Sequence, residues 1–221
     1  MLKEKMADRR LERIVDFYTL AKNVVVGGGF GDEIRWQDKI KLSELNESNF
    51  LLEAAWVVFS SGMRESVIRQ KFPEITTAFC DWSSAEQITA NALECRYSAH
   101  IAFGHLGKID SIIEIAKKIT DLGFEIFKKK IDSEGIAFLQ SLPFIGPATC
   151  FHLAKNIGLD VVKPDRHLLR ISALAGYKNP ADFCAAISRV VGDRVSVVDL
   201  VVWRYATMNP GYGHFLTQYL Q

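Results

Sequence analysis

The sequence predicts an all-α fold, in one domain or in two small lobes. Apolar residues recur at helical spacing through most of the 221 residues, and glycine or proline separates the periodic segments. The chain is 48% hydrophobic and has a mean hydropathy of +0.06, values typical of a globular protein with a sizeable core. These three observations predict a folded helical protein and exclude a disordered one.

The N-terminal elements are predicted from spacing and capping residues. Residues 3–24 should form an amphipathic helix, whose apolar positions are Leu11, Ile14, Val15, Phe17, Tyr18, Leu20 and Ala21. Residues 24–31, Val-Val-Val-Gly-Gly-Gly-Phe-Gly, follow a helix and not a strand, so we expect a flexible or tightly turned loop and no dinucleotide site. Asn46 or Ser48 is expected to cap a helix over residues 49–60.

The middle and the tail of the chain are also predicted to be helical. Residues 96–119 form a glycine-punctuated helix pair, and Asp110 or Ser111 is expected to cap the helix that runs through Ile119. Residues 180–191 and 196–206 supply further helices, which could pack with the N-terminal helix into a second lobe.

A short turn between two helical segments is the first candidate binding feature. Residues 136–142 and 148–157 have helical spacing, and Leu142-Pro143-Phe144-Ile145-Gly146-Pro147 connects them in a few residues. Gly146 would let the backbone approach a ligand, and the N–H groups that open the second helix favour a phosphate. Thr149 could add a hydroxyl.

An isolated carboxylate follows this turn. Asp165 comes directly after Pro164, which places it after an extended pair and at the start of a helix over residues 167–175. Alone, such an aspartate is most simply a helix N-cap. Capping and chemistry are compatible, because a carboxylate held by helix N–H groups stays ionised near neutral pH.

These motifs together resemble those of the helix-hairpin-helix DNA glycosylase superfamily. The similarity is to the Gly/Pro-rich loop and the catalytic aspartate of that family. It lies in Leu-Pro-x-Ile-Gly-x-x-Thr over residues 142–149, which is followed by a helix, a strand-like segment over 160–164 and Asp165-x-His167. Residues 53–68, leading to Phe72-Pro73 and Phe79, look like its early helix and wedge loop. The resemblance covers most of residues 45–177 and is to the endonuclease III, adenine glycosylase and alkyl-base glycosylase group.

The resemblance implies a two-lobed helical fold built from three segments. Residues 45–177 would form the helical core with the wedge loop, the helix-hairpin-helix motif and the Asp165 loop. Residues 1–44 would pack with the C-terminal lobe, and residues 178–221 would complete that lobe.

The resemblance also implies a function, the excision of a damaged or modified base from double-stranded DNA. The base would be flipped out and its N-glycosidic bond hydrolysed with the help of Asp165, because a nearby anion stabilises positive charge on the sugar. Glu53 and His167 are candidate supporting residues. Candidate contacts to the DNA backbone are Phe144, Gly146, Ala148, Thr149, Lys163 and Arg166. The candidate wedge loop is Ser60, Ser61, Gly62, Met63 and Arg64, and candidate walls of a base pocket are Trp56, Tyr97, His152 and Trp203.

Departures from the family pattern leave two alternatives open. Bifunctional members carry a nucleophilic lysine at the position of Ala148, so this chain is expected to be monofunctional. A bifunctional glycosylase and lyase would need a displaced lysine, Lys155 or Lys163. Phe144 replaces the first hairpin glycine, where it must avoid a positive φ or tolerate strain. A non-catalytic helix-hairpin-helix protein that only binds DNA or senses damage is therefore the second alternative.

No cofactor is expected, although the hairpin of the family can bind a monovalent cation through its carbonyls. Iron-sulfur members carry four closely spaced C-terminal cysteines, whereas the four cysteines here are Cys80, Cys95, Cys150 and Cys184. They are expected to be reduced thiols. His152, Asp165 and His167 have no recognised metal-ligand spacing, so no metal site is predicted.

Charge and hydropathy bound the partners and the location. The formal net charge of +1 gives no global steering toward DNA, but residues 128–178 carry eight cations against four carboxylates. Lys128, Lys129 and Lys130 contact phosphate or are simply a solvated helix end. No apolar run approaches the roughly 20 residues of a membrane span, and the N-terminus lacks the apolar core of a signal peptide. We expect a cytoplasmic monomer, nucleoid-associated if bacterial, with no membrane partner.

Overall fold

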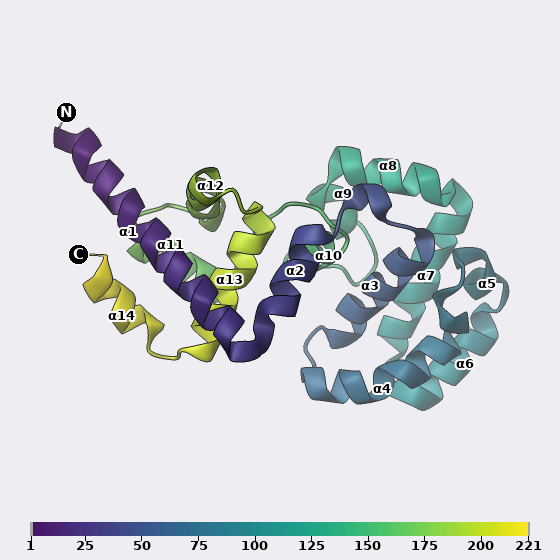
Figure 1. Cartoon of the computed structure of the whole chain (residues 1–221). Coiled ribbons are helices and arrows are strands. Elements are labelled where there is room, and N and C mark those ends of the chain that lie inside the picture. The colour runs from purple at the N-terminus through teal and green to yellow at the C-terminus, as the bar shows by residue number, and fades with distance from the viewer. Residues whose placement is uncertain (1, 221) are drawn as a thin grey trace. The chain divides into compact units, whose positions relative to one another are not determined.

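The computed structural model describes the backbone of residues 2–220 and the side chains of residues 9–220 (Figure 1). Every regular element in this part of the chain is a helix, which confirms the predicted all-α class. Contacts divide the chain into two compact units, residues 1–40 with 160–221 and residues 41–159. The outer ends of the predicted first and last segments, residues 1 and 221, lie outside the described residues.

The first unit combines the N-terminal helices with the C-terminal ones. Its elements are α1 (Leu2–Val25), a π-helical turn (Val26–Phe30), α2 (Gly31–Lys39), α11 (Arg166–Leu174), α12 (Pro180–Val191), α13 (Val195–Met208) and α14 (Tyr212–Tyr219). The predicted N-terminal helix and both predicted tail helices are therefore present.

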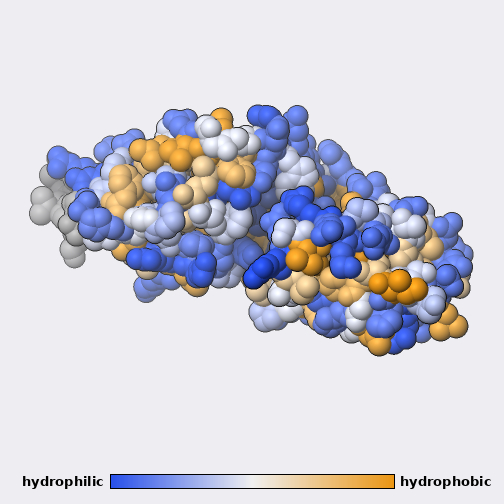
Figure 2. Space-filling model, turned by 90° about the horizontal axis from the view of Figure 1, so that it is seen from below, coloured by the Kyte–Doolittle hydropathy of each residue, from blue (hydrophilic) through white to orange (hydrophobic). Residues whose placement is uncertain are grey.

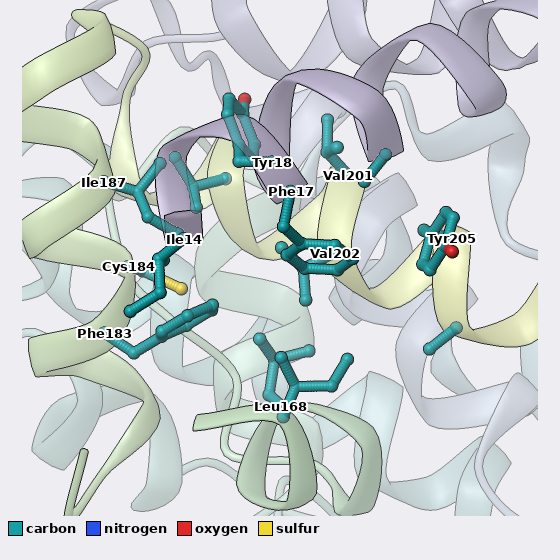
Figure 3. Close-up of a cluster of buried hydrophobic side chains, with 14 of the residues drawn as sticks. Ile14, Phe17, Tyr18, Leu168, Phe183, Cys184, Ile187, Val201, Val202 and Tyr205 are labelled. Carbon is teal, nitrogen blue, oxygen red and sulfur yellow. The ribbon is translucent and has the colours of Figure 1, made fainter. Parts of the chain in front are cut away.

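The core of this unit forms where α1, α11, α12 and α13 meet (Figure 3). Phe17 of α1 is 1% exposed and packs edge to face with Tyr205 of α13, with ring centroids 5.4 Å apart. Burying a large apolar side chain of this kind contributes about 2 kcal/mol. The residues labelled in Figure 3 come from all four helices: Ile14, Phe17, Tyr18, Leu168, Phe183, Cys184, Ile187, Val201, Val202 and Tyr205.

Charged side chains tie α2 to α13 within the same unit. The Arg204 guanidinium donates to both carboxylate oxygens of Glu33, at 2.6 and 2.8 Å. Arg194, which precedes α13, donates to the carbonyl of Ile40 at 2.7 Å and so binds the end of α2. The glycine-rich segment is the tight turn that lets α1 and α2 follow each other, with Gly29 at φ 90°.

The second unit contains the remaining helices. They are α3 (Glu47–Ser60), α4 (Glu65–Ala78), α5 (Ala85–Ala90), α6 (Ala92–Phe103), α7 (Leu106–Leu122), α8 (Phe124–Glu134), α9 (Ile136–Gln140) and α10 (Thr149–Asn156), with short 3₁₀ turns over Leu42–Glu44 and Cys80–Trp82. Asn46 caps α3 by accepting from the Asn49 N–H at 2.8 Å, as one of the two predicted caps.

Helix α3 lies in the core of the second unit, because it is apolar on almost every side. Phe50 packs edge to face with Phe127 of α8, with ring centroids 4.9 Å apart, and Phe59 packs in the same way with Phe103 of α6, with centroids 5.1 Å apart. Gly158 ends α10 at φ 93°, and a Cβ atom there would lie 2.5 Å from the Leu42 backbone nitrogen. Only glycine fits this close approach.

Three sequence-based expectations differ from the structure. The predicted segment 45–177 extends past the unit boundary, because Leu168 and Ile171 of residues 160–177 are buried in the core of the first unit. Asp110 and Ser111 do not cap α7, which begins earlier; the cap is His105, which accepts from the Lys108 N–H at 3.3 Å. Residues 160–164 form no strand.

The surface mixes hydrophilic residues with small apolar patches on the face shown in Figure 2. Within residues 2–220, no helix is both long and apolar enough to cross a membrane.

Candidate functional site

The hairpin between α9 and α10 is closed by its own hydrogen bonds. The Thr149 hydroxyl accepts from the Gly146 N–H at 2.7 Å and lies 3.2 Å from the Gly146 carbonyl. The Cys150 N–H also donates to that carbonyl, at 3.0 Å. Thr149 and Gly146, both predicted to contact the DNA backbone, therefore bond to each other. Pro147 and Ala148, which directly precede α10, are exposed residues of the hairpin.

Hairpin carbonyls were the predicted ligands of a monovalent cation. Those of Leu142, Gly146 and Pro147 already accept hydrogen bonds from within the loop. A cation would have to use the other carbonyls of the turn.

Phe144 adopts a positive φ and so tolerates strain, which is the second of the two predicted alternatives. Its φ is 62°, in the left-handed region that favours glycine, and its side chain is 42% exposed. The Phe144 ring is perpendicular to the His105 ring, with centroids 5.8 Å apart, and the Lys108 ammonium lies 5.8 Å from the centre of the Phe144 ring. These contacts offset the strain and join the hairpin to the loop between α6 and α7.

Lys108 holds the candidate wedge loop in place and was missed by the sequence analysis. Its side chain is only 3% exposed, and its ammonium donates to the carbonyls of Phe59 at 2.8 Å and Ser61 at 2.6 Å. Those carbonyls end α3 and would otherwise lack partners. Burial lowers the pKa of Lys108. The signal for it was its helical spacing with Ile112, which places it on the buried face of α7.

The wedge loop itself, residues 60–64, is a tight turn with an exposed tip. The Met63 N–H donates to the Ser60 carbonyl at 3.0 Å, and Gly62 has a φ of 70°. Met63 is 43% exposed, and Arg64 is exposed as well. Beside the loop lies an open depression, lined by Met63, Phe103, Gly104, His105, Leu106 and Gly107.

The candidate pocket residues of the second unit lie apart from this depression. Trp56 is half-buried between Phe72 and Arg69, whose centres are 5.1 and 5.4 Å from its ring. Tyr97 is 66% exposed on α6, and His152 is half-buried on α10. The fourth candidate, Trp203, belongs to the first unit, where the Arg204 guanidinium stacks 4.7 Å from its ring.

Asp165 is the N-cap of α11, as its sequence context predicts. Its Oδ1 accepts from the N–H groups of His167 at 2.8 Å and Leu168 at 3.0 Å. Among the described residues, Oδ2 has no hydrogen-bond partner. The side chain is half-buried. The cap therefore fixes one carboxylate oxygen and leaves the other available to a ligand.

The residues beside Asp165 form a second small network. His167 Nδ1 lies 3.1 Å from the Tyr212 hydroxyl, and the Arg166 Nε donates to His167 Nε2 at 3.3 Å. Arg170 stacks over the Tyr212 ring at 5.5 Å. The C-terminal helix α14 thus supports the side chains next to Asp165, a contribution that the sequence motifs did not indicate.

The lysines near the motif differ in their environments. Lys155 is 8% exposed on α10, and Lys163 is half-buried, with its backbone N–H donating to Asp199 at 2.5 Å. Lys128 binds the carbonyls of Ser43 and Leu45 at 2.7 and 2.8 Å. Lys128 is therefore a structural contact and not simply a solvated helix end.

Glu53 is half-buried on α3 and accepts from the Asn156 amide at 2.7 Å. Burial raises its pKa above the ordinary 4.5, and the Asn156 bond lowers it by less. The carboxylate faces a residue of the hairpin's second helix within the same unit.

We expect Glu53 to make part of the stability depend on pH. Because its folded-state pKa is raised, the native state binds more protons than the unfolded state just above pH 4.5, so stability falls as pH rises through this window. Glu53→Gln keeps an acceptor for Asn156 and removes this fall. In urea denaturation from pH 4 to 8, the free energy of unfolding of Glu53→Gln should rise relative to that of the wild type as pH rises. That of Glu86→Gln, at an exposed position, should not. A difference that is constant across this range would contradict the expectation.

Comparisons with known proteins add no family to these observations. No protein-family model, curated protein or solved structure matches the chain significantly. The functional assignment therefore rests on the residues of each unit.

Proposed function

We propose that this chain is a monofunctional DNA glycosylase of the helix-hairpin-helix type, which hydrolyses the N-glycosidic bond of a damaged or modified base in double-stranded DNA. The supporting observation is the Asp165 carboxylate, held at the N-terminus of α11 by two N–H groups through one oxygen only. Departure of a base leaves positive charge on the sugar, and a fixed anion stabilises that charge. The other oxygen can orient or deprotonate the attacking water.

Each unit carries its own groups that would bind the DNA backbone. In the second unit, the Cys150 N–H already donates to the Gly146 carbonyl, so a phosphate at the start of α10 would be bound by the N–H groups of Ala148 and Thr149. In the first unit, Arg166 and Arg170 are exposed on α11. The base would be extruded with Met63 or Arg64 in its place, since these are the exposed side chains of the wedge loop.

The second candidate function is DNA binding or damage sensing without chemistry. The observation that favours it is that the Asp165 cap is complete as a structural motif, because the first turn of α11 needs an acceptor whether or not a base is removed. A lyase step through Lys155 has less support, since that side chain is buried.

DNA binding is tested by the salt dependence of duplex affinity. Arg166→Gln should weaken binding to all duplexes alike and reduce the slope of log affinity against log salt by about one. Arg189→Gln, an exposed arginine on α12, is the matched control and should change the slope less. If the wild type binds no duplex at low salt, both candidate functions are wrong.

A further inference from the structure

Two cysteines of the second unit lie in direct contact. The Cys80 sulfur is 3.8 Å from the Cys95 sulfur, and both thiols are free. Cys80 follows α4, and Cys95 lies on α6. The other two cysteines belong elsewhere: Cys150 donates to the Pro147 carbonyl in the hairpin helix, and Cys184 lies on α12 of the first unit. Cys80 and Cys95 are therefore a defined pair.

The backbone that carries Cys80 is unusual. Cys80, Asp81 and Trp82 have φ values of 56°, 51° and 57°, so three consecutive residues without a glycine are left-handed. Each such residue costs free energy, since its Cβ atom crowds the following carbonyl. A run of this kind persists only where the surrounding structure holds it.

The contacts of Trp82 hold this left-handed turn. The indole is 2% exposed and stacks on Phe79, with centroids 5.1 Å apart and planes 15° apart. Its N–H donates to the Thr76 hydroxyl at 3.0 Å, and the Ser83 hydroxyl donates to the Cys80 carbonyl at 2.8 Å. The same turn that returns Trp82 to α4 places the Cys80 sulfur against Cys95.

The two thiols differ in access. Cys80 is half-buried and can be reached by a small oxidant, whereas Cys95 is 1% exposed. Burial, with the neighbouring Cys80, raises the pKa of Cys95 to about 12. Cys95 is therefore a protonated thiol at neutral pH, shielded from reagents that can reach Cys80.

We propose that Cys80 and Cys95 form a reversible intramolecular disulfide when the protein reacts with hydrogen peroxide. The Cys80 sulfur attacks one peroxide oxygen, the O–O bond breaks, and a sulfenic acid and one water result. The Cys95 sulfur then attacks the Cys80 sulfur, forming the S–S bond and expelling the hydroxyl as a second water with the Cys95 proton. Two thiols and one peroxide become one disulfide and two waters, and a dithiol reverses the link by exchange.

The geometry of the pair supports this reaction. The sulfurs already lie 3.8 Å apart, and formation of the S–S bond requires them to approach to about 2.05 Å. The link would close a loop that contains α5 and would join the end of α4 to α6. Closing a loop restricts the unfolded chain, so the oxidised protein should melt several degrees higher.

The test is oxidation of the folded full-length chain with hydrogen peroxide, followed by alkylation, intact mass measurement and peptide mapping. We expect the loss of two hydrogen atoms, a single cross-linked peptide pair containing Cys80 and Cys95, a raised melting temperature, and reversal of all three by dithiothreitol. Cys95→Ala should give a sulfenic acid at Cys80 and no rise in melting temperature. Cys150→Ala is the matched control and should form the link normally.

Two results would overturn the proposal. One is a wild type that accumulates sulfenic or sulfinic acid at Cys80 without the cross-link. The other is a cross-link that appears only after unfolding or that joins other cysteines. Should Cys95→Ala fail to fold, Cys80→Ser supplies the second variant, because its partly exposed position tolerates a hydroxyl.

Discussion

Replacing Asp165 by asparagine should abolish base release and leave the fold and duplex binding intact. Asparagine is as good an N-cap as aspartate, so its side-chain oxygen can still accept from the N–H groups of His167 and Leu168. What the substitution removes is the negative charge. If that charge stabilises the transition state, single-turnover release should fall by about 10² to 10⁴ fold.

The control for this substitution adds a negative charge at another N-cap of the same unit, whereas Asp165→Asn removes one. Asn179 caps α12 by accepting from the Asp182 N–H at 2.8 Å, and Asn179→Asp alters charge at a second N-cap of the same unit. It should release bases at the wild-type rate. Equal release by wild type and Asp165→Asn would show that Asp165 is only a cap.

Replacing Lys108 by methionine should lower the stability of the folded protein. Methionine fills the volume of the aliphatic stem, but the carbonyls of Phe59 and Ser61 lose their charged donor. Burial of the ammonium, which lowers the pKa of Lys108, also costs free energy and offsets part of what the two hydrogen bonds contribute. We expect the free energy of unfolding to fall by about 2 kcal/mol in urea denaturation.

Lys117→Met is the matched control, because Lys117 is exposed on the same helix. It should change the free energy of unfolding by less than about 0.5 kcal/mol. If the two variants are equally stable, the Lys108 ammonium is not what holds the end of α3. The order of the wedge loop would then need another explanation.

Local features of the sequence predicted the all-α class, the N-terminal helix, the two tail helices and the Asp165 cap. Pro164 followed by an aspartate and by apolar positions at Leu168 and Ile171 is enough to predict a capped helix, since both the cap and the buried face are local patterns. Asn46 was one of two caps predicted for α3 for the same reason.

Features that depend on distant acceptors or on packing were not predictable in this way. A lysine is normally exposed, and the burial of Lys108 depends on carbonyls some fifty residues earlier in the chain. The left-handed turn over residues 80–82 contains no glycine, so the sequence does not indicate it. His105 caps α7, although histidine is not a preferred cap, so the start of that helix was placed too late.

The central claim is that the chain removes bases from DNA, and the most direct measurement is the mass-spectrometric detection of free bases. Purified protein is incubated with duplexes that contain alkylated, oxidised, deaminated or hypermodified bases, and the released small molecules and the abasic strands are quantified together. The account predicts that at least one duplex yields a free base and an equal amount of abasic strand, without a borohydride-trapped adduct. Binding of these duplexes with no base released from any of them would contradict it.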